Sequence, residues 1–148
     1  MIKVEQSVLV EYTPAQMYAL VERIEDYPNF LPWCSHSDVT HRTEIETVGT
    51  LHMNYHGVKS HFTTRNRKTE NQQIDMLLMD GPFKTLSGAW LFTPLGDSAC
   101  KVELRLHYQF SSTMLEKLIG PVFNRISHNL VEAFVTQADK TYQSASGR

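Results

Sequence analysis

Histidines are the first residues of this chain whose type and spacing suggest chemistry. Of the seven histidines, His52 and His56 lie on one face of a predicted strand, and His61 follows on the return strand. Imidazoles in such an arrangement can bind zinc, but a structural zinc site needs four converging ligands, and no carboxylate or cysteine partner is evident. We therefore interpret the three histidines as part of a solvated outer face and predict no metal site.

The run Cys34-Ser35-His36 suggests a nucleophile with its base, since residues two apart share a face of an extended segment. No acidic residue that would orient the histidine is evident, so an ordinary buried thiol is the simpler interpretation. Cys34 and Cys100 show no disulfide framework pattern, and both are predicted to be free thiols. Because the sequence also has no glycine-rich phosphate loop and no paired-carboxylate signature, it favours a protein that is not an enzyme.

A basic strip lies on the outer side of one predicted strand. It consists of Lys59, Arg65 and Arg67, with Arg42 and Lys68 close in the sequence. Such a strip could contact RNA through its phosphates without reading bases. The simpler interpretation is a solubilising face, because 16 acidic residues outweigh 14 basic ones and leave a formal net charge of -2.

These side chains must be positioned by regular elements, of which the clearest is a long helix predicted over residues 111–142. Thr113 and Glu116 have the spacing of a capping box at its start. Pro121 predicts either a kink or the junction of two helices. An apolar stripe at helical spacing runs along the segment. The stripe consists of Leu115, Leu118, Ile119, Val122, Ile126, Leu130, Ala133, Phe134 and Ala138.

The rest of the chain reads as one strand, one or two short helices and about six more strands. Residues 2–11 alternate in polarity, as expected for a half-buried strand. Thr13 and Gln16 form a capping box that opens a helix predicted over residues 14–25. From residue 37 to residue 110 the period of the pattern is two, with turn residues between the strands.

One predicted hairpin sets the register of the histidines. Gly57 can take the first central position of a type II′ turn. A turn at Gly57 and Val58 places His61 opposite Asn54. The three histidines would then be diagonal neighbours on the outer face.

Together these elements predict an α+β fold in which a curved antiparallel sheet of about seven strands wraps around a long C-terminal helix. One helix about 10 Å across cannot fill so wide a concavity, which leaves space for a small molecule. We expect one domain over residues 1–143 and a disordered tail over residues 144–148. The sequence has no membrane-spanning apolar run and no signal layout, so we expect a cytoplasmic protein.

Adaptable apolar side chains are expected to line this space. For any one of them, packing in the core is the simpler interpretation, but methionines and aromatics as a group suit a flexible apolar ligand. The polar tips of Tyr55, Tyr108 and Trp90 would be among its few hydrogen-bonding groups. The predicted ligand-binding residues are Phe30, Trp33, Met53, Tyr55, Phe62, Met76, Leu78, Phe83, Trp90, Phe92, Tyr108, Phe123 and Leu130.

Residues 27–34 lie between the first helix and the sheet, where the mouth of a cavity would be. Two prolines leave room for about one helical turn, and three aromatic residues fall within seven positions. The segment is either a rigid connector or a gate in which Phe30 and Trp33 control lipid access.

Four spaced motifs carry a resemblance to a known family. They are Tyr27-Pro28-x-Phe30-Leu31-Pro32-Trp33-Cys34, Gly81-Pro82-Phe83-x-x-Leu86-x-Gly88-x-Trp90-x-Phe92-x-Pro94, Tyr108-x-Phe110 and Val131-x-Ala133-Phe134. The order of the elements resembles the START-like, polyketide cyclase-like helix-grip superfamily. Within it, the motifs resemble the coenzyme Q-binding protein family, whose bacterial members are also called ribosome association toxins. The resemblance extends over residues 2–142.

The resemblance implies two different functions. One is the non-enzymatic binding of a polyprenyl quinone such as ubiquinone, in support of respiration, with no required cofactor and only transient membrane contact. The other is a toxin, paired with an antitoxin protein, that binds the large ribosomal subunit and blocks subunit association. For this function the basic strip of Lys59, Arg65 and Arg67 is the candidate ribosome-binding site. Because helix-grip relatives include cyclases, a cyclase-type enzyme is a third and weaker alternative.

Overall fold

The chain forms one seven-stranded antiparallel sheet that curves around a long helix. The computed structural model describes residues 1–143, and the predicted tail over residues 144–148 lies outside the described residues. The strand order is β1-β7-β6-β5-β4-β3-β2, which confirms the predicted meander. The strands are β1 (Ile2–Val10), β2 (Cys34–Arg42), β3 (Glu46–Tyr55), β4 (Val58–Thr69), β5 (Gln73–Asp80), β6 (Phe83–Leu95) and β7 (Ala99–Phe110).

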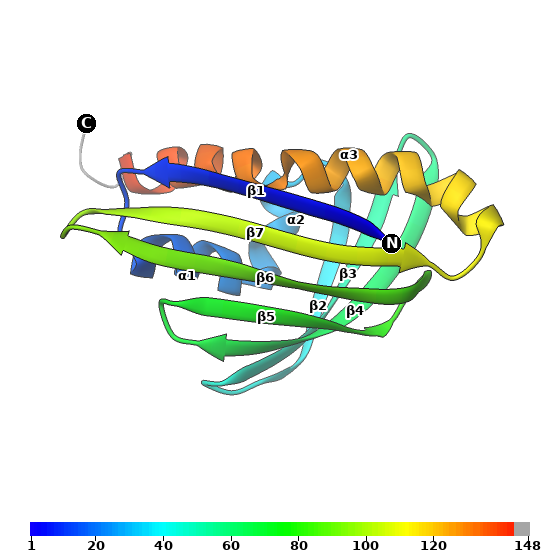
Figure 1. Cartoon of the computed structure of the whole chain (residues 1–148), viewed down its shortest axis with the longest axis horizontal. Coiled ribbons are helices and arrows are strands. Elements are labelled where there is room, and N and C mark those ends of the chain that lie inside the picture. Colours follow the sequence, from blue (N-terminus) through cyan, green and yellow to red (C-terminus); the bar gives the residue numbers. More distant parts are fainter. Residues whose placement is uncertain (144–148) are drawn as a thin grey trace.

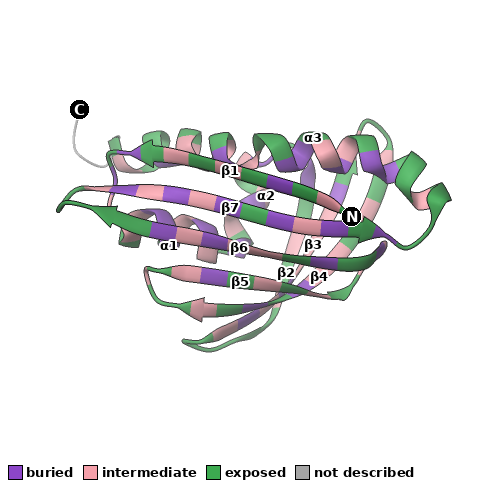
Figure 2. Cartoon of the chain, viewed as in Figure 1, coloured by how far each residue is buried: buried purple, intermediate pink, exposed green. Residues whose placement is uncertain are grey.

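The C-terminal helix α3 (Thr113–Ala138) covers the inner face of this sheet. Figure 1 shows β1 and β7 running along the helix, while β2, β3 and β4 curve round behind it. Alternate residues of β7 are buried beneath α3, from Cys100 to Phe110, whereas residues between them such as Arg105 point outward. The resulting alternation of buried and exposed positions is visible along the strands in Figure 2. The predicted α+β fold is therefore confirmed.

α3 differs from the prediction in detail. Its N-cap is Ser112, one residue before the predicted Thr113, because the amide of Leu115 donates to the Ser112 hydroxyl at 3.1 Å. The helix continues through Pro121 without dividing into two, although its first turns lean away from the rest (Figure 1). A π-helical turn, η2 (Asp139–Gln143), follows it. Leu118 is 60% exposed, so the buried stripe excludes it. The stripe passes through Ile119, Phe123, Ile126, Val131, Phe134 and Ala138.

The first helix is shorter than predicted. α1 (Pro14–Glu22) begins with the expected capping box, in which the Gln16 amide donates to the Thr13 hydroxyl at 3.1 Å. It ends before residue 25 because Arg23 leaves helical geometry. A 3₁₀ turn, η1 (Ile24–Asp26), and the single turn α2 (Tyr27–Phe30) follow. This break turns Ile24 and Tyr27 into the core, where both are buried.

The hairpin between β3 and β4 is shifted by one residue from the prediction. His56 and Gly57 both have positive φ, at 50° and 80°, which is the pattern of a type I′ turn. Tyr55 therefore pairs with Val58, and His61 lies opposite His52 instead of Asn54.

β2 forms one edge of the sheet and is irregular. It pairs only with β3, and its register shifts between Cys34 and His36 and again between Val39 and His41. Such bulges bend a strand and increase its twist. β2 thereby stays close to η1, where the Ser37 hydroxyl donates to the carbonyl of Ile24 at 2.9 Å.

An ion-pair network joins α1 and η1 to β2 and β4. Arg42 donates to Glu22 at 2.9 Å and to both carboxylate oxygens of Glu25, and Lys68 reaches the same Glu22 oxygen at 3.0 Å. The Lys68 side chain is only 5% exposed. Neither Arg42 nor Lys68 therefore extends the basic strip on the outer face, as their positions in the sequence had suggested.

The Arg42–Glu25 pair makes stability depend on pH. Hydrogen bonds from Arg42 hold the pKa of Glu25 at about 2, well below its ordinary value of 4.5. In the unfolded chain Glu25 takes up a proton near pH 4.5, whereas in the folded protein it stays ionised to about pH 2. The pair therefore stabilises the fold above pH 4.5, and this contribution is lost as the pH falls from 4.5 towards 2.

We expect Arg42→Met to remove part of this acid sensitivity. Urea unfolding at about pH 5.5 and about pH 3 should show a smaller loss of unfolding free energy in Arg42→Met than in the wild type. Lys84→Met is the control, because Lys84 is exposed and makes no ion pair within residues 1–143. An identical loss in all three proteins would show that Arg42 does not lower the pKa of Glu25.

Candidate ligand-binding cavity

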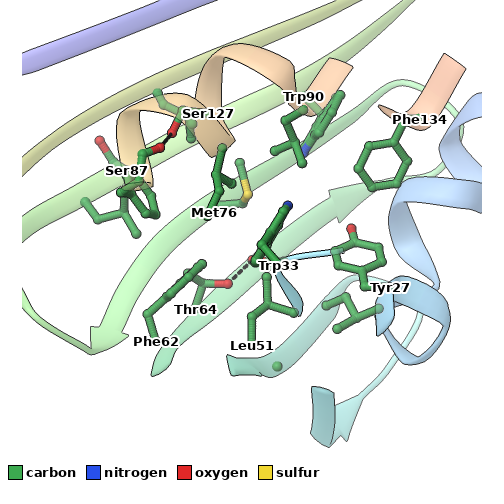
Figure 3. A pocket seen from close by; sticks show the side chains of 18 residues that line it. Tyr27, Trp33, Leu51, Phe62, Thr64, Met76, Ser87, Trp90, Ser127 and Phe134 are labelled. Carbon is green, nitrogen blue, oxygen red and sulfur yellow. Dashed lines mark hydrogen bonds between the residues drawn. The ribbon is translucent and has the colours of Figure 1, made fainter. Parts of the chain in front are cut away.

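An apolar cavity of about 80 Å³ lies between α3 and the middle of the sheet (Figure 3). Every layer of the fold contributes to its wall, from η1 and α2 through β3–β7 to α3. The lining residues are Ile24, Tyr27, Trp33, Gly49, Leu51, Phe62, Thr64, Asn66, Met76, Leu86, Ser87, Trp90, Leu106, Phe123, Ile126, Ser127, Leu130 and Phe134. The space that the sequence predicted between helix and sheet is therefore present.

Two aromatic clusters close the cavity at its ends. At one end the ring of Phe123 on α3 lies 4.9 Å from Phe83 and 4.8 Å from Tyr108, measured between ring centroids. At the other end Phe134 lies 5.3 Å from Tyr27 and 5.2 Å from Trp90. The rings meet edge to face, an arrangement that aromatic pairs favour. α3 is thereby fixed to the sheet at two points, with the cavity between them.

The cavity wall is neutral. No residue that lines it within the described part of the chain is an acid, a base or a cysteine. Three of its four hydroxyl groups are already engaged, since Thr64 donates to the Asn66 amide oxygen at 2.8 Å, Ser127 donates to the carbonyl of Phe123 at 2.8 Å, and Tyr27 donates to the carbonyl of Val21. Burial raises the pKa of Tyr27, so this phenol stays protonated. The cavity therefore suits a neutral molecule.

A groove of about 190 Å³ lies outside the cavity, between α3 and the hairpin of β3 and β4. Cavity and groove share Trp33, Ile126 and Leu130, which we call the partition. The backbone of Trp33 is held in place because its carbonyl accepts from the amide of Asn54 at 2.9 Å. The other groove residues are Leu31, Pro32, Tyr55, Arg125, Asn129 and Ala133.

The size of the cavity limits what it can hold. Typical ligand pockets measure about 300–1,000 Å³, so about 80 Å³ accommodates only a small group. A larger ligand requires the partition to move and join the cavity to the groove. Trp33, one of the two residues predicted to form a gate, lies in this partition between cavity and groove.

The predicted ligand-binding residues fall into four positions. Trp33, Phe62, Met76, Trp90, Phe123 and Leu130 line the cavity. Tyr55 is half-buried at the groove, where its ring packs on His56. Phe30 packs against Phe134 at 5.2 Å and borders a separate recess beside α3, so it lies away from the partition.

The remaining five, Met53, Leu78, Phe83, Phe92 and Tyr108, do not line the cavity. They pack among other side chains of the core. Phe92 stacks beside Trp90, and Phe83 stacks on Phe110. The Tyr108 hydroxyl, predicted to meet a ligand, donates instead to the side chain of Asn124 on α3. Sequence alternation places these residues on the inner face but does not distinguish the wall of a cavity from filled core.

The sequence analysis missed the small and polar part of the wall. Thr64 and Asn66 follow Phe62 at alternate positions of β4, so the period-two pattern already placed them on the inner face. Both are buried, at 9% and 8% exposure. The predicted residues were all large apolar or aromatic side chains, yet Leu51, Leu86 and Leu106 also line the cavity and were not among them.

Cys34 is not a nucleophile paired with His36. Its thiol is buried, burial raises its pKa to about 11, and its sulfur contacts the backbone carbonyl of His36 at 3.5 Å. The imidazole of His36 lies on the outer side, where it bonds Asp38 at 2.8 Å. Cys34 and Cys100 are both free, as predicted.

The outer histidines form a row across β2, β3 and β4. The His52 ring lies 5.3 Å from His36 and 5.8 Å from His61. Contrary to the sequence interpretation, carboxylates accompany them, since Asp38 lies 3.4 Å from His52 and Asp80 lies 3.5 Å from His61. Even so, no group of three or more potential ligands within residues 1–143 is placed to hold a metal ion.

The basic strip lies on the outer face of β4, opposite the cavity. Lys59, Arg65 and Arg67 are exposed. Arg65 lies 3.3 Å from Glu46, and Arg67 pairs in register with Glu46 and Asp75. The strip is therefore partly neutralised by its neighbours.

The sequence matches a known protein family and is similar to named proteins. Residues 10–135 match the family described as polyketide cyclase / dehydrase and lipid transport. The ribosome association toxin RatA of Vibrio cholerae serotype O1 is 45% identical over 140 residues, which cover 95% of this chain and 97% of that protein. The mitochondrial coenzyme Q-binding protein COQ10 homolog B of Xenopus laevis is 25% identical over 146 residues, which cover 95% of this chain and 59% of that protein.

A solved structure shares the fold. The Zhui aromatase/cyclase from Streptomyces sp. R1128 matches with a TM-score of 0.78 at 16% identity, over 94% of each chain. Likeness at this identity concerns the fold alone. Among residues 1–143, no helix combines the length and the apolar character needed to cross a membrane.

Proposed function

Because the chain belongs to the polyketide cyclase / dehydrase and lipid transport family, we propose that it binds a polyprenyl quinone in the cavity beneath α3 and acts as a lipid carrier or chaperone. The family resemblance predicted from the motifs is confirmed by the match over residues 10–135. The observation that carries the proposal is the apolar, uncharged cavity between helix and sheet.

The energetics favour such a ligand without any charged anchor. Each buried methylene contributes about 0.8 kcal/mol, so a few isoprene units are enough for useful affinity. Met76, Trp90 and Phe134 supply adaptable and aromatic surface around the tail. The coenzyme Q-binding name of the Xenopus relative supports the same ligand class.

A catalytic role receives no support from the cavity wall. A cyclase needs a group that moves protons, and the hydroxyls of Tyr27, Thr64 and Ser127 are engaged in hydrogen bonds. The likeness to an aromatase/cyclase extends to the fold only. We therefore propose a binding protein rather than an enzyme.

The test is mass spectrometry of an organic extract from freshly purified protein. We expect a prenylated quinone in stoichiometric amount from the wild type and none from Met76→Lys, because a lysine in the apolar cavity would be buried without a partner. Met79→Lys is the matched control, since Met79 lies on the same strand but is 51% exposed. The wild type yielding no quinone and failing to take up added quinone would contradict the proposal.

A second function, association with the large ribosomal subunit, is favoured by the ribosome association toxin that is 45% identical over most of both chains. In this chain the basic strip would supply phosphate contacts. It lies on the face of β4 opposite the cavity, so the two functions do not compete for one surface. Both functions would place the protein in the cytoplasm.

For this function we expect Arg65→Glu combined with Arg67→Glu to abolish cosedimentation with the large subunit, because two attractive charges become repulsive. The control is Lys84→Glu combined with Lys117→Glu, which makes the same change of charge at exposed positions on β6 and α3. Binding of the wild type should also weaken as salt rises. Unaltered sedimentation of the Arg65/Arg67 variant would remove the basic strip from the interface.

A further inference from the structure

Three N–H groups border the cavity without a protein acceptor. They are the indole N–H groups of Trp33 and Trp90 and the side-chain amide of Asn66. No described residue accepts a hydrogen bond from any of the three. Figure 3 shows the two indole nitrogens on the sides of their rings that face the space between Trp33, Trp90 and Met76.

These donors face open space rather than protein. Within residues 1–143, only Gln6 Oε1 is a side-chain polar atom that is both sealed in the interior and without a partner. The two indole nitrogens and the Asn66 amide nitrogen are therefore not sealed off, although their residues are at most 8% exposed, and all three residues line the cavity. A buried donor without an acceptor is costly, so water or a ligand atom must satisfy it.

The hydroxyl groups of Thr64 and Ser127 do not supply that acceptor. Thr64 is close enough to bond the Asn66 amide, but it donates to the amide oxygen and leaves the amide N–H groups unused. Ser127 bonds back to the carbonyl of Phe123 on its own helix. The cavity thus presents three donors within a largely apolar wall.

We propose that Asn66, Trp33 and Trp90 form a donor set that binds a carbonyl oxygen on the ring of the ligand and so selects a quinone head over an apolar ring of the same size. This inference rests on the proposed function and adds the chemistry that recognises the head. A quinone carries acceptors only, which matches the three free N–H groups of the wall, since these can only donate. A ring without oxygens would leave all three donors unpaired, and such mismatches discriminate strongly between ligands.

The shape of the wall supports a flat ring next to these donors. Trp33, Trp90, Phe62 and Phe134 place aromatic surfaces around the same space (Figure 3). With the head held at Asn66 and Trp33 in place, the tail leaves past Ile126 and Leu130, the α3 residues of the partition, towards the groove beside Tyr55. The head therefore lies inside and the prenyl tail leads outward.

The test compares two probes that share a tail, decyl-1,4-benzoquinone and decylbenzene. The wild type should bind the quinone more tightly, and Asn66→Leu should weaken quinone binding roughly tenfold while leaving decylbenzene binding unchanged. Asn54→Leu is the matched control, because Asn54 is exposed on the outer face of β3. Equal loss of both probes in Asn66→Leu would overturn the donor role, since it would report a damaged cavity.

The carbonyl stretch of the bound quinone provides a readout that does not depend on affinity. Hydrogen bonding lowers this infrared frequency, so we expect the band to lie lower in the wild type than in Asn66→Leu. Trp90→Phe removes one indole N–H, so its band should also lie at a higher frequency than that of the wild type. Bands at the same frequency in all three proteins would overturn the inference while leaving ligand binding intact. If neither probe binds the wild type, the proposed function and this inference both fail.

Discussion

The structure depends on the way α3 is held against the sheet by Phe123 and Phe134. These rings are eleven residues apart, about 16 Å along the helix, and each inserts into its own aromatic cluster. Between the two anchors the helix cannot approach the curved sheet more closely, because the anchors and the curvature set the separation. The cavity is therefore a consequence of how the core is packed, and filling it with side chains would require a different helix position.

The two faces of strand β4 carry side chains with different roles. Its inward residues Thr64 and Asn66 give the cavity its polar character, whereas the outward Arg65 and Arg67 form most of the basic strip. The period of two along a strand makes this possible within four consecutive residues. Lys68 follows the same alternation. Its side chain points inward and pairs with Glu22, so it is not part of the basic strip.

The sequence predicted the fold well because its signals are local and repeated. Alternation over long strands and the capping box at Thr13 are sufficient to place the elements. The predictions of local structure were wrong where a single residue decides where an element begins or ends. Either Ser112 or Thr113 could cap α3, and only backbone geometry shows that Ser112 does so. The site was harder to predict, because whether Phe92 fills space or borders it depends on packing between distant segments.

The two bulges of β2 have a consequence for how copies of this protein meet in solution. A sheet with free edges can pair with another chain and grow into aggregates. Here β1 lies against α3, where the Gln6 side chain donates to the carbonyl of His128. At the opposite edge, the bulges interrupt the regular row of backbone groups on β2, and the charged side chains of Asp38 and Arg42 flank it. The irregularity of β2 therefore acts as a barrier to edge-to-edge association.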